Sequence, residues 1–152
     1  MGSAVAVGRE RAALPAPRSR AEFRELLERA LREVDSEDRA GTLLRATGLR
    51  IRFEFPDLDM VLNVAATDGG DHHLRWSFAD SAEWDPKLEL RMDSAVANAY
   101  LQGTESLAIA MARRQVRCSG EARVALLYLP AIRLLSDPYR RIAEGEYRHL
   151  VL

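Results

Sequence analysis

Residues 102–135 read QGTESLAIAMARRQVRCSGEARVALLYLPAIRLL, a stretch rich in apolar residues and divided by Gly103 and Gly120. Because glycine commonly ends a helix, Gly103 predicts the end of one helix, and Thr104 can cap the next. A short strand, QVRCSG, then leads through Gly120 into a final apolar helix. The stretch contains much hydrophobic surface and no nucleophile beside a base, so we expect its helices to cover the apolar face of a sheet.

The limits of these helices follow from capping residues and prolines. The helix that ends at Gly103 can begin at Asp93 or Ser94. The final helix runs over 121–135, and Pro130 predicts a bend or break in it. We expect Pro138 to close this helical region.

The residues before this stretch alternate between apolar and polar, which is typical of strands. Four such segments are LRIRFEF (49–55), LDMVLNVAA (58–66), HHLRWSF (72–78) and KLELRM (87–92). The sequence TDGGD (67–71) predicts a hairpin turn, since its glycines tolerate a positive φ. We therefore expect these four segments to form an antiparallel meander.

The N-terminal part of the chain predicts two more helices. Ser19 and Glu22 form a capping box, and apolar residues follow at helical spacing up to Val34. A shorter helix over 37–47 should end at Gly48. We expect residues 1–18 to be a flexible tail and 19–152 a single domain that includes an N-terminal helical extension, 19–48. The fold class is α+β, with an approximately five-stranded, mainly antiparallel sheet covered by helices on one face.

Composition limits the function. The chain has 152 residues and a net charge of -1, which gives no electrostatic reason to expect binding to nucleic acid. It has one cysteine, Cys118, no pattern of a secretory signal, and no stretch of about 20 apolar residues that could span a membrane. We therefore expect a cytoplasmic protein without stable membrane insertion.

The residues with catalytic or ligand chemistry form no recognisable site. His72 and His73 are neighbours on a predicted strand, where they point to opposite faces and cannot readily chelate one metal ion. Ser106 and Ser119 lack the context of an activated serine. Cys118 on a short strand is typical of a small buried apolar residue. The sequence thus predicts no catalytic residue, no metal and no cofactor.

The run LRWSFADSAEWDPKLELRMDSAVANAYLQGTESLAIAMARRQVRCSGEARVALLYLPAIRLL resembles the sterol carrier protein 2 (SCP2-like) family. The shared pattern is an alternating strand (KLELRMD), a short helix ending in glycine (NAYLQG) and a helix of small and apolar residues (ESLAIAMARRQ). A strand ending in glycine and an acid (VRCSGE) and a terminal apolar helix (ARVALLYLPAIRLL) complete it. The resemblance covers roughly residues 49–142 and depends on patterns and on Gly103 and Gly120.

This resemblance implies a non-catalytic intracellular carrier with an apolar tunnel for a fatty acid, an acyl-CoA, a sterol or a similar lipid. The positions that match would line the tunnel from the sheet and the helices. They are Trp76, Phe78, Leu88, Leu90, Met92, Tyr100, Leu107, Met111, Leu127, Leu129 and Ile132. Arg113, Arg114 and Arg117 would either meet an anionic headgroup or form a solvated basic face.

Two alternatives remain open on the sequence. The first is a protein-interaction or accessory module that serves a partner enzyme, in which Phe53, Phe55 and Trp76 fill the interior; the N-terminal helices could then recruit the partner or form a homodimer. The second is an enzyme or an accessory to one, which would need a polar cluster at the cavity mouth. The candidates for that cluster are Asp80, Glu83, Asp85 and Tyr100.

Overall fold

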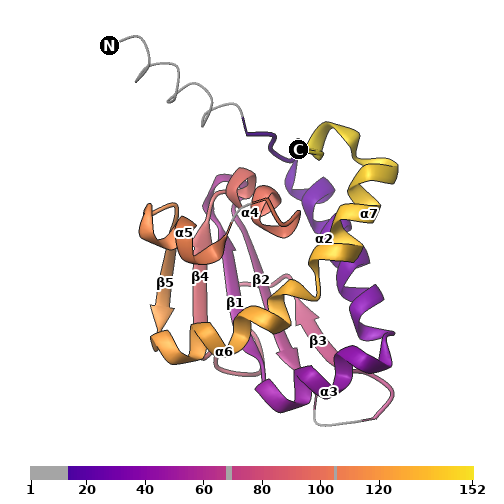
Figure 1. Cartoon of the computed structure of the whole chain (residues 1–152), viewed down its shortest axis with the longest axis vertical. Helices are drawn as coiled ribbons and strands as arrows, with labels where there is room; N and C mark the ends of the chain where they lie inside the picture. Colours follow the sequence, from indigo (N-terminus) through magenta and orange to yellow (C-terminus); the bar gives the residue numbers. More distant parts are fainter. Residues whose placement is uncertain (1–13, 68–69, 105) are drawn as a thin grey trace.

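A five-stranded mixed sheet forms the centre of the molecule, with the strand order β3-β2-β1-β4-β5. The computed structural model describes residues 14–67, 70–104 and 106–152, so part of the predicted TDGGD turn and the N-terminal residues 1–13 lie outside the described residues (Figure 1). The strands are β1 (Arg50–Phe55), β2 (Met60–Ala66), β3 (Leu74–Ser77), β4 (Leu88–Met92) and β5 (Val116–Gly120). The predicted α+β class is confirmed.

The register of the strands separates an apolar face from a polar one. In β1, Ile51 and Phe53 lie opposite Val64 and Leu62 of β2 and opposite Leu88 and Leu90 of β4. All six of these side chains are buried. The intervening β1 residues, Arg50, Arg52 and Glu54, lie on the opposite face and are exposed or half-buried. The alternation read from the sequence therefore gives the face of each residue correctly.

The predicted meander is right for β1, β2 and β3 and wrong for β4, which pairs in parallel with β1. Parallel neighbours need a long crossover connection, and residues 78–87 provide it. This segment passes over the polar face, where Asn63 donates a hydrogen bond to the carbonyl of Ala79 (2.8 Å) and Arg52 donates one to the carbonyl of Asp80 (2.5 Å). Carbonyl groups of the crossover thus accept hydrogen bonds from polar side chains on the polar face of the sheet, as the alternation in the strands predicts.

Six α-helices lie within the described residues, together with two short 3-10 turns. They are α2 (Arg20–Asp35), α3 (Asp38–Thr47), α4 (Ser94–Leu101), α5 (Leu107–Ala112), α6 (Ala122–Arg133) and α7 (Ser136–Glu146); the 3-10 turns are Pro56–Leu58 and Arg148–Leu150. Figure 1 shows α5 and α6 across one face of the sheet and α7 beside α2. In this part of the chain no helix is long and apolar enough to cross a membrane.

The predicted N-terminal helices are confirmed at their caps. The amide of Glu22 donates to Ser19 Oγ (3.1 Å), so Ser19 caps the helix as predicted, whereas the Glu22 carboxylate accepts from the amide of Arg18 (2.7 Å) and not from that of Ser19. Helix α3 ends at Gly48, which is left-handed with φ 58°. Phe23 of α2 is fully buried and packs edge-on against Phe55 of β1, with ring centroids 5.0 Å apart. Helix α2 is therefore part of the main core.

The prediction that Pro138 closes the helical region is wrong. Pro138 is the third residue of α7, in the first turn of the helix. Amides of the first turn have no acceptor inside the helix, so a proline there costs little. Pro130, which also lies inside a helix, is in the last turn of α6, and the chain continues into α7 only three residues after α6 ends.

A buried polar network joins α4 to the C-terminal segment. Asn98 donates to the carbonyl of Leu150 (2.9 Å) and accepts from the hydroxyl of Tyr139 (2.7 Å) and from Gln102 (2.8 Å). Asn98 and Tyr139 are fully buried, so each of these bonds removes the cost of an unpaired buried group. The network holds α4 against α7 and against the residues near the C-terminus.

We expect Gly120→Ala to lower the free energy of unfolding by about 1–3 kcal/mol, because Gly120 has φ 132° and an added Cβ would lie 2.7 Å from the carbonyl oxygen of Lys87. Gly145→Ala is the matched control, since nothing lies within 4 Å of its added Cβ and alanine favours the helix. Urea unfolding measures both. Equal stability of the two variants would contradict the close approach at Gly120.

Candidate functional site

A groove of about 570 Å³ lies between the end of α4, helix α5 and helix α6. Its apolar lining includes Tyr100, Leu107, Ile109 and Leu129, and its polar lining includes Arg133. Tyr100 and Leu107 are buried, Leu129 is half-buried, and 49% of Ile109 is exposed. The groove therefore runs from a buried apolar floor to an exposed apolar rim.

Local structure at the end of α4 shapes the groove. The helix ends at Leu101, and Gly103 takes the left-handed conformation with φ 82°. The hydroxyl of Thr104 donates back to the carbonyl of Ala99 (2.8 Å) and closes the turn. The predicted helix end at Gly103 is correct, whereas the predicted cap of the next helix at Thr104 is wrong, because α5 begins after Ser106. The longer turn separates α4 from α5 and leaves space between them.

The start of α4 is fixed by a residue from another part of the chain. Asp57, in the turn after β1, accepts hydrogen bonds from the amide (2.9 Å) and the hydroxyl (2.5 Å) of Ser94. A carboxylate at this position pairs an otherwise unsatisfied amide and complements the helix dipole. Asp57 therefore performs the capping that the sequence had assigned to Asp93 or Ser94. This anchor orients α4 and with it Tyr100.

The outer side of α6 carries an exposed apolar stripe. Leu126 is 68% exposed and Leu127 51% exposed, and Pro130 is exposed next to them. Arg123 and Arg133 end the stripe on either side. Large apolar side chains that remain exposed to solvent next to a groove are typical of surfaces that bind a ligand, a membrane or another protein.

Tyr100 combines an apolar setting with an unpaired polar atom. Burial raises the pKa of its phenol to about 12, and the positive charge of Arg133 opposes part of that rise. A phenol is protonated at neutral pH even without this rise, so the hydroxyl can donate a hydrogen bond. Among the described residues it has no hydrogen-bond partner. A buried hydroxyl without a partner costs free energy, so its position calls for an explanation.

The structure brings together three of the eleven predicted tunnel residues in this groove, namely Tyr100, Leu107 and Leu129. Four others, Leu88, Leu90, Met92 and Ile132, are nearly inaccessible members of the core. Leu127 is exposed on α6, and Met111 is half-buried at the end of α5. Trp76 and Phe78 lie on β3 and just after it, where the guanidinium of Arg24 stacks on Phe78 at 4.9 Å.

The groove residues that sequence reasoning missed as members of the site include Ile109 and Arg133. Arg113, Arg114 and Arg117, the arginines considered for a headgroup, are exposed and do not line the groove. The available signal was spacing, because Arg133 follows Leu129 by four residues on α6 and so shares its side of the helix. Which arginine meets the groove depends on how α6 lies relative to α4, and the sequence does not give that.

Glu83 and Tyr100, two members of the polar cluster considered for an enzyme, line different hollows. Glu83 lies in the crossover near Arg75 (3.8 Å between Arg75 Nη1 and Glu83 Oε2) and lines a hollow with Trp84, whereas Tyr100 lines the groove between α4 and α6. In the described ranges, no three or more His, Cys, Asp or Glu side chains are grouped in a way that could hold a metal ion.

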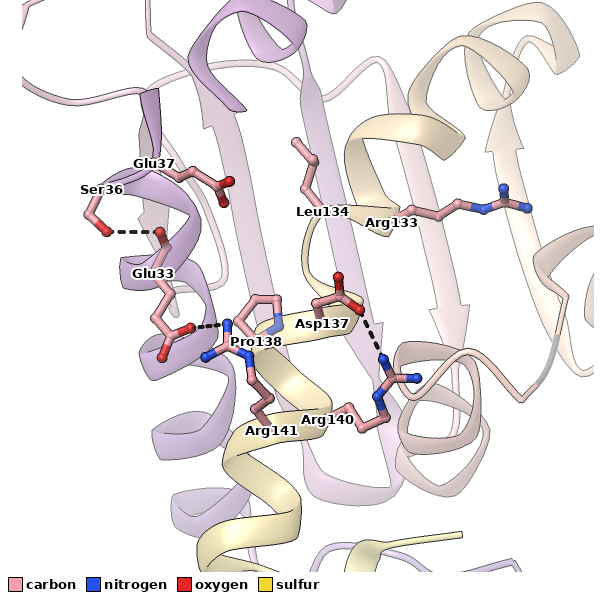
Figure 2. Close-up of a pocket in the computed structure, with 9 residues that line it drawn as sticks. All are labelled: Glu33, Ser36, Glu37, Arg133, Leu134, Asp137, Pro138, Arg140 and Arg141. Atoms are coloured by element: carbon pink, nitrogen blue, oxygen red, sulfur yellow. Dashed lines mark hydrogen bonds and ion pairs between the residues drawn. The ribbon is translucent and has the colours of Figure 1, made fainter. Parts of the chain in front are cut away.

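A second hollow, of about 720 Å³, lies where α2, α6 and α7 meet. Figure 2 shows two ion pairs in it, Arg141 with Glu33 (2.9 Å) and Arg140 with Asp137 (3.0 Å). The side chain of Arg133 extends away from both pairs. Glu37 also lines this hollow and takes part in neither pair. Because charged side chains dominate the lining of this hollow, whereas the other groove has a buried apolar floor, we regard the groove at Tyr100 as the better candidate for an apolar ligand.

His72 and His73 attach β3 to the end of α2. The carboxylate of Asp35 accepts from the amides of His73 (2.6 Å) and Leu74 (2.9 Å) and lies 2.7 Å from His72 Nδ1. Burial raises the pKa of Asp35, but its hydrogen bonds to His72, Leu74 and His73 outweigh burial and lower it below its ordinary value. The hydrogen bond to Asp35 raises the pKa of His72, and the charges of Asp35 and Asp71 add to that rise.

The chain has an SCP2-like fold, as comparison with solved structures shows. Sterol carrier protein 2 from Yarrowia lipolytica in its apo form superimposes with a TM-score of 0.55 at 7% sequence identity, over 74% of this chain and 88% of that one. The UbiJ-SCP2 ubiquinone synthesis protein gives a TM-score of 0.52 at 13% identity, over 70% and 85%. No protein-family model and no curated protein sequence matches the chain.

Part of a larger enzyme has a similar fold. The stereoselective inverting sec-alkylsulfatase Pisa1 from Pseudomonas sp. gives a TM-score of 0.50 at 11% identity, over 62% of this chain. This chain covers only 14% of the length of the sulfatase. At these identities the comparisons establish the fold alone.

We expect the pKa of His72 to exceed 6.5 in an NMR titration and to fall towards that value in Asp35→Asn. Asp71→Asn is the control, because Asp71 contributes least to the shift and its loss should change the pKa less. The raised pKa means that the His72 pair stabilises the fold below about pH 6.5 and ceases to do so as the pH rises through the folded pKa. An unchanged His72 pKa in Asp35→Asn would show that the pair does not form.

Proposed function

We propose that this protein binds a small hydrophobic or amphipathic molecule, such as a fatty acid or another lipid, in the groove between α4, α5 and α6. The observation that carries the proposal is the combination of a buried apolar floor (Tyr100, Leu107) with an exposed apolar rim (Ile109). A volume of about 570 Å³ lies within the range of roughly 300–1,000 Å³ that small-molecule sites have. We propose that the protein acts as a carrier rather than as an enzyme.

The free energy available is adequate for this role. Each CH₂ group that leaves water contributes about 0.8 kcal/mol, so an acyl chain that buries ten such groups gains about 8 kcal/mol before ordering costs. Ordering the chain and losing its translational freedom removes several kcal/mol of this gain. The remainder corresponds to an affinity in the micromolar to millimolar range. Such a ligand is held and released readily, as a carrier requires.

The names of the structural neighbours support the proposal at the level of class. Two of them are a sterol carrier protein and a ubiquinone synthesis protein, and both names concern apolar molecules. The eleven residues expected to line a tunnel remain a proposal, in which Tyr100, Leu107 and Leu129 contact the ligand first. Leu88, Leu90, Met92 and Ile132 would contribute only if the helices move apart from the sheet, because they are buried in the core.

The second candidate is an interaction or accessory module, and the packing under α2 favours it. Phe53 and Phe55 stack with ring centroids 6.3 Å apart, and Phe23 packs against Phe55, so aromatic rings fill the space between α2 and the sheet. The exposed stripe at Leu126 and Leu127 would then contact a protein partner or a second copy of the chain. Sedimentation of the purified protein distinguishes a homodimer from a monomer.

We expect Leu129→Trp to reduce the uptake of a fluorescent fatty acid by about tenfold or more, because the indole would occupy the groove that the half-buried leucine lines. Fluorescence titration of delipidated protein measures the affinity, and thermal unfolding checks that the variant folds.

Leu126→Trp is the matched control, because Leu126 is on the same helix and exposed but does not line the groove. This variant should bind the fatty acid as the unmodified chain does. If both variants bind with unchanged affinity, the ligand site lies elsewhere. If only Leu126→Trp loses binding, the exposed stripe and not the groove is the contact surface.

A further inference from the structure

Two of the polar side chains that line the groove, Tyr100 and Arg133, can donate hydrogen bonds to a ligand. Tyr100 is 7% exposed, and its hydroxyl has no hydrogen-bond partner in the described part of the chain. Arg133 lines the same groove from α6. Between them, the two side chains offer a neutral donor in a buried position and a positive charge at the surface.

Among the described residues the Tyr100 hydroxyl has no hydrogen-bond partner, and the hydroxyl side chains of Thr104, Ser106 and Ser136 also line the groove. The Tyr100 phenol is protonated at neutral pH, as a phenol with the ordinary pKa of 10.0 already is, and a guanidinium is always charged. Among the described residues, no carboxylate lies within 4.0 Å of the Arg133 guanidinium, whereas Arg140 and Arg141 nearby are both paired. A ligand that supplies an anionic oxygen would satisfy both groups.

The rest of the groove selects against a small inorganic anion. Leu107, Ile109 and Leu129 line the same groove with apolar surface, and that surface gains nothing from binding phosphate or acetate alone. An apolar tail attached to the anion would cover these side chains. A ligand that matches both the donors and the apolar lining of the groove is an amphipathic anion.

We propose that the groove recognises the anionic head of a single-chain lipid, with its carboxylate or phosphate oxygens at Tyr100 and Arg133 and its tail over Leu107 and Leu129. This inference rests on the proposed function, because it assumes that the groove is a ligand site, and it adds the chemical class of the ligand. It also assigns the roles: Tyr100 fixes the head by a charge-assisted hydrogen bond, and Arg133 attracts it from solvent.

The test displaces a neutral environment-sensitive dye, N-phenyl-1-naphthylamine, from delipidated full-length protein. The competing ligands are hexadecanoate, hexadecyl phosphate and methyl hexadecanoate, each below its aggregation limit, with acetate and inorganic phosphate as anions without a tail. We expect hexadecanoate and hexadecyl phosphate to compete at least about tenfold better than the methyl ester, because hydrogen bonds to charged groups are the stronger ones. Whichever of the two competes better identifies the head as carboxylate or phosphate.

Two variants assign the effect to residues. Tyr100→Phe removes only the hydroxyl and should weaken hexadecanoate binding about tenfold while leaving the ester unchanged. Arg133→Gln should weaken it up to about fivefold, since Arg133 is exposed, and should abolish its dependence on salt. Arg123→Gln, at the other end of α6 and outside the groove, is the control and should change neither.

The outcomes separate this inference from the proposed function. If the dye binds and is displaced equally well by the acid and the ester, the groove takes neutral apolar ligands and the headgroup site is wrong. The same conclusion follows if the acid is preferred but Tyr100→Phe and Arg133→Gln bind it normally. If neither the dye nor any tailed ligand binds, the proposed function itself fails. Displacement by acetate or phosphate alone would show a simple anion site and would also overturn the inference.

Discussion

The parallel pairing of β1 with β4 is the constraint on which the rest of the structure depends. Ile51 and Phe53 lie opposite Leu88 and Leu90 at the centre of the sheet, where these side chains are almost inaccessible. Because the two strands are parallel, their carboxyl ends lie at the same edge of the sheet. The turn after β1 therefore meets the helix after β4, and Asp57 can cap α4 at Ser94. An antiparallel β4 would have placed these residues at opposite edges.

The position of α4 then determines the groove. Its first turn is fixed by Asp57, and its last turns are fixed by the network of Asn98 and Gln102 with Leu150. A helix held at both ends has little freedom to tilt or rotate, so Tyr100 keeps one position relative to α6. The separation of α4 from α5 by the turn at Gly103 leaves the groove beside it. The groove is thus a consequence of anchors that lie outside it.

The sequence predicted local features well and neighbour relations poorly. Ser19 and Gly48 marked helix ends correctly because caps act within a few residues, and alternation in β1 identified its buried face. Alternation does not tell which strand lies beside β4, because Leu88, Leu90 and Met92 would be equally buried next to β3 or next to β1. Pro138 was misread because a proline suits the first turn of a helix as well as the residue after its end.

The candidate site shows the same division. Tyr100, Leu107 and Leu129 were found through their positions in a pattern of apolar helices, which a single chain displays in its sequence. Arg133 was not found, because its place in the groove depends on how the C-terminal part of α6 lies relative to α5 and the end of α4. A shift of a few ångströms in the position of a helix decides whether one of its apolar side chains is buried in the core or lines the groove. Tertiary packing sets that position, and the sequence pattern does not show it.

The buried polar atoms along α4 differ in whether the fold gives them a hydrogen-bond partner. Asn98 and Gln102 are buried, and the fold gives each of them hydrogen bonds to the carbonyl of Leu150 and to one another. Two residues along the helix from Asn98, the hydroxyl of Tyr100 receives no partner from the described residues. A phenylalanine would fill the same space without the cost of an unpaired hydroxyl, so packing alone does not account for a tyrosine. The proposed ligand, with an anionic head and an apolar tail, would give this hydroxyl a partner.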